Sequence, residues 1–405
     1  MTAGDGQDGS GTGPRTLRRI EGGQGGRSGT GGPGDGEGPG TDDSGGPGTD
    51  DGGGPGTGAR IHLVRFAPAK LNLTLAVLGR REDGYHSLHS VMVPLALGDA
   101  LTVTVPHAAR HDTLRISGIA LGVDPDNLVL RAVAATRAAV EESWPGAPVR
   151  PPWLAARLVK RIPVAAGLGG GSSDAAAAIE AALAAWHTTM PFADRARLAA
   201  SLGSDVSFFL ARANALITGR GEFVEPLPEI SGEPPAILLV TPQLPVATPD
   251  VFAAYAAGAR PGDPARARRI SEHLAGDLRG GMTSSRLLDL AADLAAANDL
   301  LPAATTVEPG LVDFMHSLER HLGRPVCQSG SGPTQWILYP TLADARKAGR
   351  SVRIALSDGS LPSVGIGEPF VAATAIMPPH LPPSDVQPAI AGRTYGPRTV
   401  HNEET

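Results

Sequence analysis

The chain has 405 residues, a formal net charge of −6 and a single cysteine. The first 59 residues contain nine acidic and four basic side chains, so the remainder is close to neutral, which argues against nucleic acid as a partner. Cys327 alone excludes an internal disulfide framework, and no Cys/His cluster has the spacing of a zinc site. No run approaches the roughly 18 apolar residues of a membrane span, and no signal-peptide core is present. We therefore expect a cytoplasmic protein that does not bind membranes.

Composition divides the chain into a folded body and two tails. Residues 1–59 contain 24 of the 53 glycines and almost no large apolar side chain, so we expect a disordered tail. The Pro-rich residues 378–405 are expected to form a loose C-terminal tail. Within the body, Pro234-Pro235 precedes an apolar run and predicts a boundary between domains at 60–235 and 236–377.

In the first domain, alternating apolar residues from Arg65 to Val77 predict a half-buried strand on which Lys70 and Asn72 project from the same face. Strands and helices are then expected in alternation. The strands are Ala100–Val105, Thr113–Ile116 and Trp153–Lys160; the helices are Asn127–Val140, Ala175–Leu183 and Ala193–Leu202, with a short segment at Ser204–Arg212.

The second domain is expected to alternate in the same way. The predicted strands are Ala236–Val240, Gln335–Tyr339 and Phe370–Ile376; the predicted helices are Pro249–Ala257, Met282–Ala297, Pro309–Leu322 and Leu342–Arg350. Pro261–Gly281 has the composition of a polar insertion. Together the two halves indicate an α/β or α+β body of two domains.

The most informative motif is the glycine-rich run from Ile162 to Asp174, which leads directly into an alanine-rich helix. Such a loop presents unpaired backbone N–H groups and the positive end of a helix dipole, and these two features together form a binding site for phosphate. It lacks the Gly-Lys-Ser/Thr of a Walker A loop and the distal acidic residue of a dinucleotide-binding fingerprint. A tight turn in a glycine-rich chain is the alternative.

Two charged residues are candidates for chemistry beside this loop. The chain has only three lysines against 32 arginines, so a lysine on a strand indicates a need for a compact ammonium. Lys70 is this lysine, and Asp205 lies in Gly203-Ser-Asp-Val. A lysine, a carboxylate and a phosphate loop are the set that phosphoryl transfer needs. The alternatives are a strand-end lysine and a helix N-cap formed by Ser204 or Asp205.

Seven motifs together resemble the GHMP kinases in their order along the chain. They are Pro68-Ala-Lys-Leu-Asn-Leu73, Arg81-Glu-Asp-Gly-Tyr-His-Ser-Leu88, the run from Pro163 to Ala175, Gly203-Ser-Asp-Val206, Gly219-Arg-Gly-Glu222, Asn298-Asp-Leu300 and Ser329-Gly-Ser-Gly332. The resemblance spans about Val64 to Ile376. It is similar in detail to the members that act on 4-diphosphocytidyl-2-C-methyl-D-erythritol.

This resemblance implies a two-domain α+β fold, with a ribosomal-protein-S5-domain-2-like N-terminal domain and a ferredoxin-like C-terminal domain. It implies an ATP- and Mg²⁺-dependent kinase of the non-mevalonate isoprenoid pathway, a monomer or weak homodimer, that phosphorylates the 2-hydroxyl of this cytidine substrate. The implied catalytic residues are Lys70 and Asp205, and no residue is assigned as a metal ligand.

The resemblance also assigns binding residues. For ATP they are Asn127, Lys160, Pro163, Gly167, Leu168, Gly169, Gly170, Gly171, Ser172 and Ser173. For the cytidine substrate they are Asn72, Tyr85, His86, Thr248 and Phe252, with the two aromatic rings stacking on cytosine and the histidine reading its edge. Each aromatic has a plainer alternative as a turn or core residue.

Two alternatives and two departures accompany this interpretation. The chain could be another GHMP kinase, acting on homoserine, mevalonate or phosphomevalonate, or a nucleotide-binding module without catalysis.

Ser207 stands where the family usually has proline, and Arg212-Ala-Asn-Ala215 replaces a run that usually contains glycine. The second departure raises the question of how a turn with positive φ is made without glycine.

Overall fold

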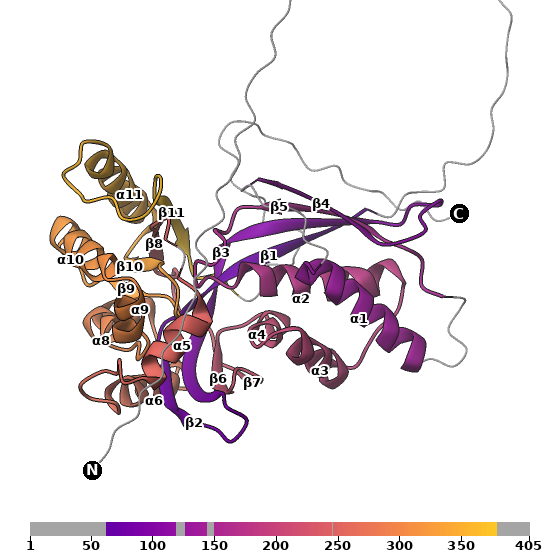
Figure 1. Ribbon diagram of the computed structural model, residues 1–405, viewed down its shortest axis with the longest axis horizontal. Helices are drawn as coiled ribbons and strands as arrows, with labels where there is room; N and C mark the ends of the chain where they lie inside the picture. Colours follow the sequence, from indigo (N-terminus) through magenta and orange to yellow (C-terminus); the bar gives the residue numbers. More distant parts are fainter. Residues whose placement is uncertain (1–61, 119–125, 144–149, 245, 379–405) are drawn as a thin grey trace, which may run out of the picture. The chain divides into compact units, whose positions relative to one another are not determined.

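The computed structural model describes residues 62–118, 126–143, 150–244 and 246–378. The glycine-rich segment 1–59 and residues 379–405, for which the sequence predicts tails, lie outside the described residues. Within the described ranges, the strands form two sheets, one of seven strands and one of four (Figure 1). None of the helices in these ranges is long and apolar enough to cross a membrane.

The larger sheet is organised around one long strand, β3, which pairs with β1, β2, β5 and β6. The path of the sheet runs β4-β5-β3-β6-β7, and β4 and β5 are parallel. Its strands are β1 (His62–Asn72), β2 (Ala76–Arg80), β3 (His86–Thr104), β4 (Thr113–Gly118), β5 (Ala155–Lys160), β6 (Ala215–Gly219) and β7 (Phe223–Pro226).

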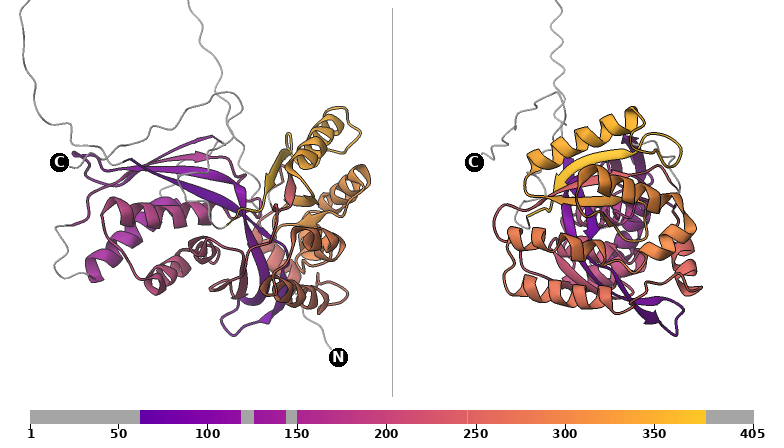
Figure 2. Two further views of the ribbon diagram at one scale, coloured as in Figure 1. Left: turned by 180° about the vertical axis from the view of Figure 1, so that it is seen from behind. Right: turned by 90° about the vertical axis from the view of Figure 1, so that its left-hand side faces the viewer.

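Four helices lie on one side of this sheet (Figures 1 and 2). They are α1 (Leu128–Ser143), α2 (Gly170–Ala185), α3 (Phe192–Leu202) and α4 (Val206–Ala211). Helix α2 is buried on nearly all sides, including Ala175–Ala178 and Ile179. Its alanine side chains are small enough for it to pack against α1, α3, α4, β1 and β3. This packing holds the glycine-rich loop at its N-terminus in a fixed place.

The smaller sheet is antiparallel and has the order β11-β8-β10-β9. Its strands are β8 (Ala236–Thr241), β9 (Cys327–Gln328), β10 (Gln335–Tyr339) and β11 (Phe370–Ala375). The helices of this half are α5 (Thr248–Ala256), α6 (Arg266–Arg279), α7 (Ser284–Asp289), α8 (Ala291–Ala295), α9 (Leu301–Val307), α10 (Gly310–Leu322) and α11 (Leu342–Ser357). β8 begins directly after Pro235, where the sequence places a domain boundary.

Alternate side chains of β8 enter two different cores. Leu238 and Val240 pack in a cluster with residues of α10 and α11. Ile237 and Leu239 belong to a second cluster that also contains Leu71 of β1 and further residues of β3. Because strand side chains alternate between faces, β8 is buried on both of them. The two sheets therefore share one apolar core, and the division into two domains stays a prediction.

The shared core corrects the expectation of a single half-buried strand from Arg65 to Val77. β1 ends at Asn72, and β2 begins at Ala76. Both faces of the segment are covered, so that Lys70 is 4% exposed and Asn72 is 2% exposed. The alternation in the sequence is genuine, but its polar positions face a buried polar region rather than solvent.

The prediction that Pro261–Gly281 is a polar insertion is also wrong. It contains helix α6, whose Leu274 and Leu278 are buried in the core that the two sheets share. The opposite face of the helix is charged, and this charge dominates the composition of the segment. The helix expected over Met282–Ala297 is interrupted at Leu290 and forms α7 and α8.

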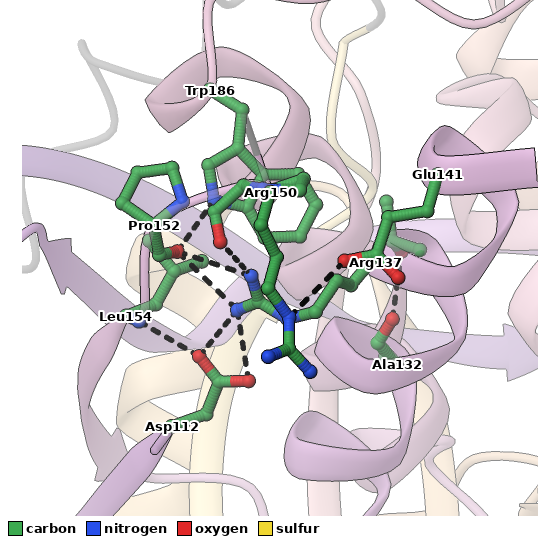
Figure 3. A network of polar contacts seen from close by, with 10 residues as sticks. Asp112, Ala132, Arg137, Glu141, Arg150, Pro152, Leu154 and Trp186 are labelled. Carbon is green, nitrogen blue, oxygen red and sulfur yellow. Dashed lines mark hydrogen bonds and ion pairs between the residues drawn. The ribbon is translucent and has the colours of Figure 1, made fainter. Parts of the chain in front are cut away.

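Arg137 of α1 is buried and contacts three other segments of the chain (Figure 3). The Arg137 guanidinium donates to both carboxylate oxygens of Asp112, at 2.7 and 3.0 Å, and to the carbonyl oxygen of Pro152. Its carbon lies 4.5 Å from the ring centroid of Trp153 and 4.8 Å from that of Trp186. A planar guanidinium can stack on aromatic rings and bind a carboxylate in its plane, which a lysine cannot do.

We expect Arg137→Met to lower the free energy of unfolding by about 3–5 kcal/mol, because it leaves the largely buried Asp112 carboxylate without its partner. Arg150→Met is the control, since Arg150 also stacks on Trp153 but its side chain is 70% exposed. This control should change stability by less than about 1 kcal/mol. Urea unfolding of the two variants measures the difference, and equal losses would contradict the assignment.

Candidate active site

One cavity of about 1280 Å³ gathers most of the residues that the sequence singles out. Fifteen of the seventeen predicted site residues line it, namely Lys70, Asn72, Tyr85, His86, Asn127, Lys160, Pro163, Gly167, Gly169, Gly170, Gly171, Ser172, Asp205, Thr248 and Phe252. The two that do not are Leu168 and Ser173, whose side chains are buried beneath the loop. The cavity exceeds the usual volume for one small ligand and can hold two substrates.

The glycine-rich loop ends at Gly169, the N-cap of α2, with φ 69° in the left-handed region. Gly170 and Gly171 therefore belong to the first turn of the helix, where N–H groups lack intrahelical partners. A Cβ atom on Gly169 would lie 2.9 Å from Cγ of Lys70, so both the backbone conformation and the close approach require glycine. The loop thus passes directly over the candidate lysine.

A second glycine loop supports the first from the other half of the chain. Ser329 donates its hydroxyl to the carbonyl oxygen of Gly167 at 3.0 Å. A Cβ atom on Gly332 would lie 2.4 Å from the backbone nitrogen of Gly167. In the same loop, the Ser331 hydroxyl bonds that of Thr248 at 2.8 Å. The phosphate loop is therefore held by residues more than 160 positions away in the sequence.

Lys70 and Asp205 meet at the cavity wall. The Lys70 ammonium donates to Oδ1 of Asn72 at 2.6 Å and lies 3.6 Å from Oδ2 of Asp205. Asp205 occupies the N-cap position of α4, yet its side chain makes no capping hydrogen bond. The Asp205 carboxylate therefore does not cap the helix, and it lines the cavity beside the ammonium.

A buried ion-pair cluster lies at the base of the loop. The Lys160 ammonium bonds Asp174 at 2.7 Å and also bonds Asp99. Burial and the neighbouring Asp99 carboxylate raise the pKa of Asp174 to about 8, against the opposing effect of Lys160. Burial would lower the pKa of Lys160, but Asp174 and Asp99 outweigh it and raise that pKa. Asp99 and Asp174 thus both hold the Lys160 ammonium, and the bond to Asp174 fastens β5 to α2.

Asn127 directly precedes the first residue of α1. Its Oδ1 accepts from the backbone N–H of Val129 at 2.9 Å, where α1 begins. Oxygen-to-backbone bonding of this kind satisfies one of the free donors at a helix start. The side-chain amide nitrogen of Asn127 takes no part in this cap, and the residue lines the cavity.

The aromatic residues predicted to hold a base lie on the same cavity in an unexpected arrangement. The rings of His86 and Phe252 stack, with centroids 5.4 Å apart and an interplanar angle of 26°. Tyr85 is 61% exposed, and its ring lies 5.2 Å from the guanidinium carbon of Arg220. Burial, followed by the charges of Arg80 and Arg260, lowers the pKa of His86, so its ring is neutral near pH 7.

The two departures from the family pattern both have structural outcomes. Ser207 lies inside α4, where its hydroxyl bonds the carbonyl oxygen of Ala196 at 3.5 Å. Arg212 ends this helix with φ 50°, so it adopts the left-handed conformation without being glycine. Its guanidinium pairs with Glu180 of α2. This ion pair offsets part of the strain that the missing glycine imposes.

Several cavity residues were not predicted. Asp174, Arg80, Arg220 and Ser331 all line the cavity. Three of them stand inside motifs that the sequence displays: Asp174 ends the glycine-rich run, Arg220 lies between two glycines, and Ser331 belongs to the second glycine loop. Arg80 directly precedes the motif Arg81–Leu88, and the β2–β3 hairpin brings it to the cavity.

Comparison with known proteins agrees with this geometry. Residues 127–212 match the family described as the GHMP kinases N-terminal domain. The chain is 38% identical over 287 residues to the 4-diphosphocytidyl-2-C-methyl-D-erythritol kinase of Paramagnetospirillum magneticum, covering 70% of this chain and 90% of the relative.

Solved structures give the same result for the fold. A crystal structure of 4-(cytidine 5'-diphospho)-2C-methyl-D-erythritol kinase is 30% identical, with a TM-score of 0.54 over 77% of this chain and 99% of that one. A homoserine kinase from Cytophaga hutchinsonii has a TM-score of 0.55 over 78% of this chain and 95% of that one, but it is only 17% identical and supports the fold alone. The extent and sequence identity of the matches to the Paramagnetospirillum magneticum kinase and to the crystal structure of the same kind of kinase place this chain in the 4-diphosphocytidyl-2-C-methyl-D-erythritol kinase family of GHMP kinases.

Proposed function

We propose that this kinase transfers the γ-phosphoryl group of ATP to the 2-hydroxyl of 4-diphosphocytidyl-2-C-methyl-D-erythritol. The observation that carries the proposal is that a single cavity is lined by the phosphate loop, the Lys70–Asp205 pair and the His86–Phe252 aromatic pair. A kinase for a cytidine substrate needs a site for triphosphate, a site for transfer and a surface for a base. Homoserine and mevalonate contain no base and give the aromatic pair no purpose.

Phosphoryl transfer demands positioning and charge compensation rather than covalent chemistry by the protein. In the proposed role, the Asp205 carboxylate orients the acceptor hydroxyl and accepts its proton as the acceptor oxygen bonds the γ-phosphorus. The bond from the γ-phosphorus to the oxygen that bridges to the β-phosphate breaks in the same step, and ADP leaves. The Lys70 ammonium offsets negative charge that spreads over the transferring group. The N–H groups of Gly170 and Gly171 at the start of α2 hold the phosphate oxygens.

The residues at this place fit a Mg²⁺ ion that is bound mainly through phosphate oxygens. Among the described residues, no three His, Cys, Asp or Glu side chains form a group that could hold a metal. Mg²⁺ in kinases commonly takes one or two protein oxygens and completes its shell with phosphates and water. Asp205 and the hydroxyl of Ser172, which both line the cavity, would supply these protein oxygens. When bound, the ion would neutralise charge on the phosphates.

For the base, we propose that Phe252 provides a stacking face and that the neutral His86 ring reads the polar edge. A neutral imidazole carries both a donor and an acceptor, as the edge of cytosine does. In the described arrangement the two rings lie against each other. Entry of cytosine therefore requires His86 to move away from Phe252 or the base to stack on the outer face of one of the two rings.

The substrate is tested by incubating the protein with ATP, Mg²⁺ and one acceptor at a time: the cytidine substrate, homoserine or mevalonate. We expect phosphate to appear on the cytidine substrate only, because only it uses the aromatic pair. Product identification by mass spectrometry and phosphorus NMR locates the transferred group. Transfer to homoserine or mevalonate with none to the cytidine substrate would overturn the proposal.

We expect Asp205→Asn to lower kcat by roughly 10²–10⁴-fold, the range for loss of a positioned acid/base group. Lys70→Arg should also lose activity, because Gly169 packs closely on Cγ of Lys70 and Gly330 lies near the ammonium, so that a wider guanidinium cannot take the same position. Steady-state kinetics measure both variants, with Asp194→Asn as the control on an exposed ion pair. Near-normal turnover in a folded Asp205 variant would return this residue to a structural role.

Removing a stacking partner from a base costs about 1–3 kcal/mol, equivalent to a roughly 5- to 150-fold change in affinity. We therefore expect Phe252→Ala to raise the KM for the cytidine substrate in that range while the KM for ATP stays near its original value. Phe223→Ala is the matched control, since Phe223 is 62% exposed and does not line the cavity. An equal rise in both KM values would indicate that Phe252 serves packing instead.

A further inference from the structure

A chain of buried hydrogen bonds leads away from Lys70 into the protein. Lys70 donates to Oδ1 of Asn72 at 2.6 Å, and Nδ2 of Asn72 donates to the hydroxyl oxygen of Ser90 at 2.8 Å. The Ser90 hydroxyl in turn donates to the backbone carbonyl oxygen of Thr74 at 2.6 Å. Ser90 has no exposed surface and does not line the cavity. It therefore reaches the site only through Asn72.

The direction of these bonds is fixed by chemistry. A carbonyl oxygen can only accept, so the single proton of the Ser90 hydroxyl is committed to Thr74. Ser90 can then only accept from Asn72, which requires the amide NH₂ group to face Ser90. The amide oxygen consequently faces Lys70. The reverse orientation would place NH₂ against an ammonium, which has no acceptor to offer.

We infer that Ser90 is a positioning residue that sets the orientation of the Asn72 amide and thereby the place of the Lys70 ammonium in the transfer site. The inference rests on the proposed function only in that Lys70 takes part in phosphoryl transfer. Buried networks of this kind fix a single arrangement when every member is satisfied. Loss of the Ser90 hydroxyl leaves the NH₂ group without its acceptor and removes the reason for the amide to keep its orientation.

A neighbouring branch of the same polar region provides a matched control. Ser271 of α6 has no exposed surface, accepts from the Thr74 hydroxyl at 2.7 Å and bonds Nδ1 of His89 at 2.8 Å. It makes no bond to Asn72. Ser271→Ala therefore removes a buried hydroxyl with two partners from the same region, as Ser90→Ala does, without freeing the Asn72 amide.

The first readout does not depend on activity. Because the chain contains only three lysines, protein carrying ¹³C at lysine Cε gives three side-chain signals by NMR, and the signal missing in Lys70→Arg identifies Lys70. We expect Ser90→Ala to shift the Lys70 signal and Ser271→Ala to leave it in place. A Lys70 signal that is unmoved in Ser90→Ala, or moved equally by both variants, would overturn the inference whether or not the cytidine compound proves to be the substrate.

The second readout is kinetic. Misplacing a reacting group by about an ångström costs up to roughly 100-fold in rate, so we expect Ser90→Ala to lower kcat roughly 10- to 100-fold with little change in the KM for ATP. Ser271→Ala should keep the original kcat. In an Asn72→Ala background, Ser90→Ala should have almost no further effect, because its route to Lys70 is already removed. A full additional loss in that background would show that Ser90 acts otherwise than through Asn72.

Discussion

The site depends on a lysine ammonium that is taken out of water. Burying a charge is unfavourable unless hydrogen bonds and counter-charges replace its hydration. Lys70 obtains these from one amide oxygen and from a carboxylate whose side chain is 27% exposed. This support is enough to hold the ammonium and leaves it incompletely neutralised. An anionic phosphate entering the cavity would complete its surroundings.

The contrast with Lys160 shows how the same residue type serves two purposes. Lys160 contacts the carboxylates of Asp99 and Asp174, and burial first and the Asp99 charge second raise the pKa of Asp174 to about 8. These two buried side chains hold the Lys160 ammonium in place. It ties the end of β5 to the first turns of α2, and Oδ1 of Asp99 also accepts from the backbone N–H groups of Arg161 and Ile162 at the entry to the loop. One lysine is therefore suited to charge compensation and the other to holding the loop.

The glycines are explained by the same crowding. Backbone passes over Lys70 at Gly169, and a Cβ on Gly330 would come within 3.5 Å of the ammonium from the other side. These approaches bring backbone from both halves of the chain to one side chain. They are possible because the two sheets share a core that contains residues of β1, β3, β8 and β10. The apolar packing of the whole body thus determines the geometry around one charged atom.

The features that depend on neighbouring residues can be read from the amino-acid sequence alone. Short motifs encode the phosphate-binding loop, the alanine-rich helix that follows it, and the candidate lysine and aspartate. The spacing of a few residues is enough to fix backbone conformation and helix position. The order of seven such motifs was enough to indicate the family, and the resemblance assigned fifteen of the residues that line the cavity. The glycine-rich run also predicted where α2 lies, although the helix begins at Gly170 rather than at Ala175.

The contacts between distant segments, in contrast, become visible only in the folded protein. The charged composition of residues 261–281 hid a helix, because its apolar stripe has meaning only against the core that it covers. Three contacts join residues from separate segments of the chain: the pairing of Lys160 with Asp99 and Asp174, the stacking of His86 on Phe252, and the link from Ser90 through Asn72 to Lys70. A sequence specifies which groups can donate, accept or stack. Which of them meet is settled by strand register and by the packing of one sheet against the other, where each buried polar group must find a partner.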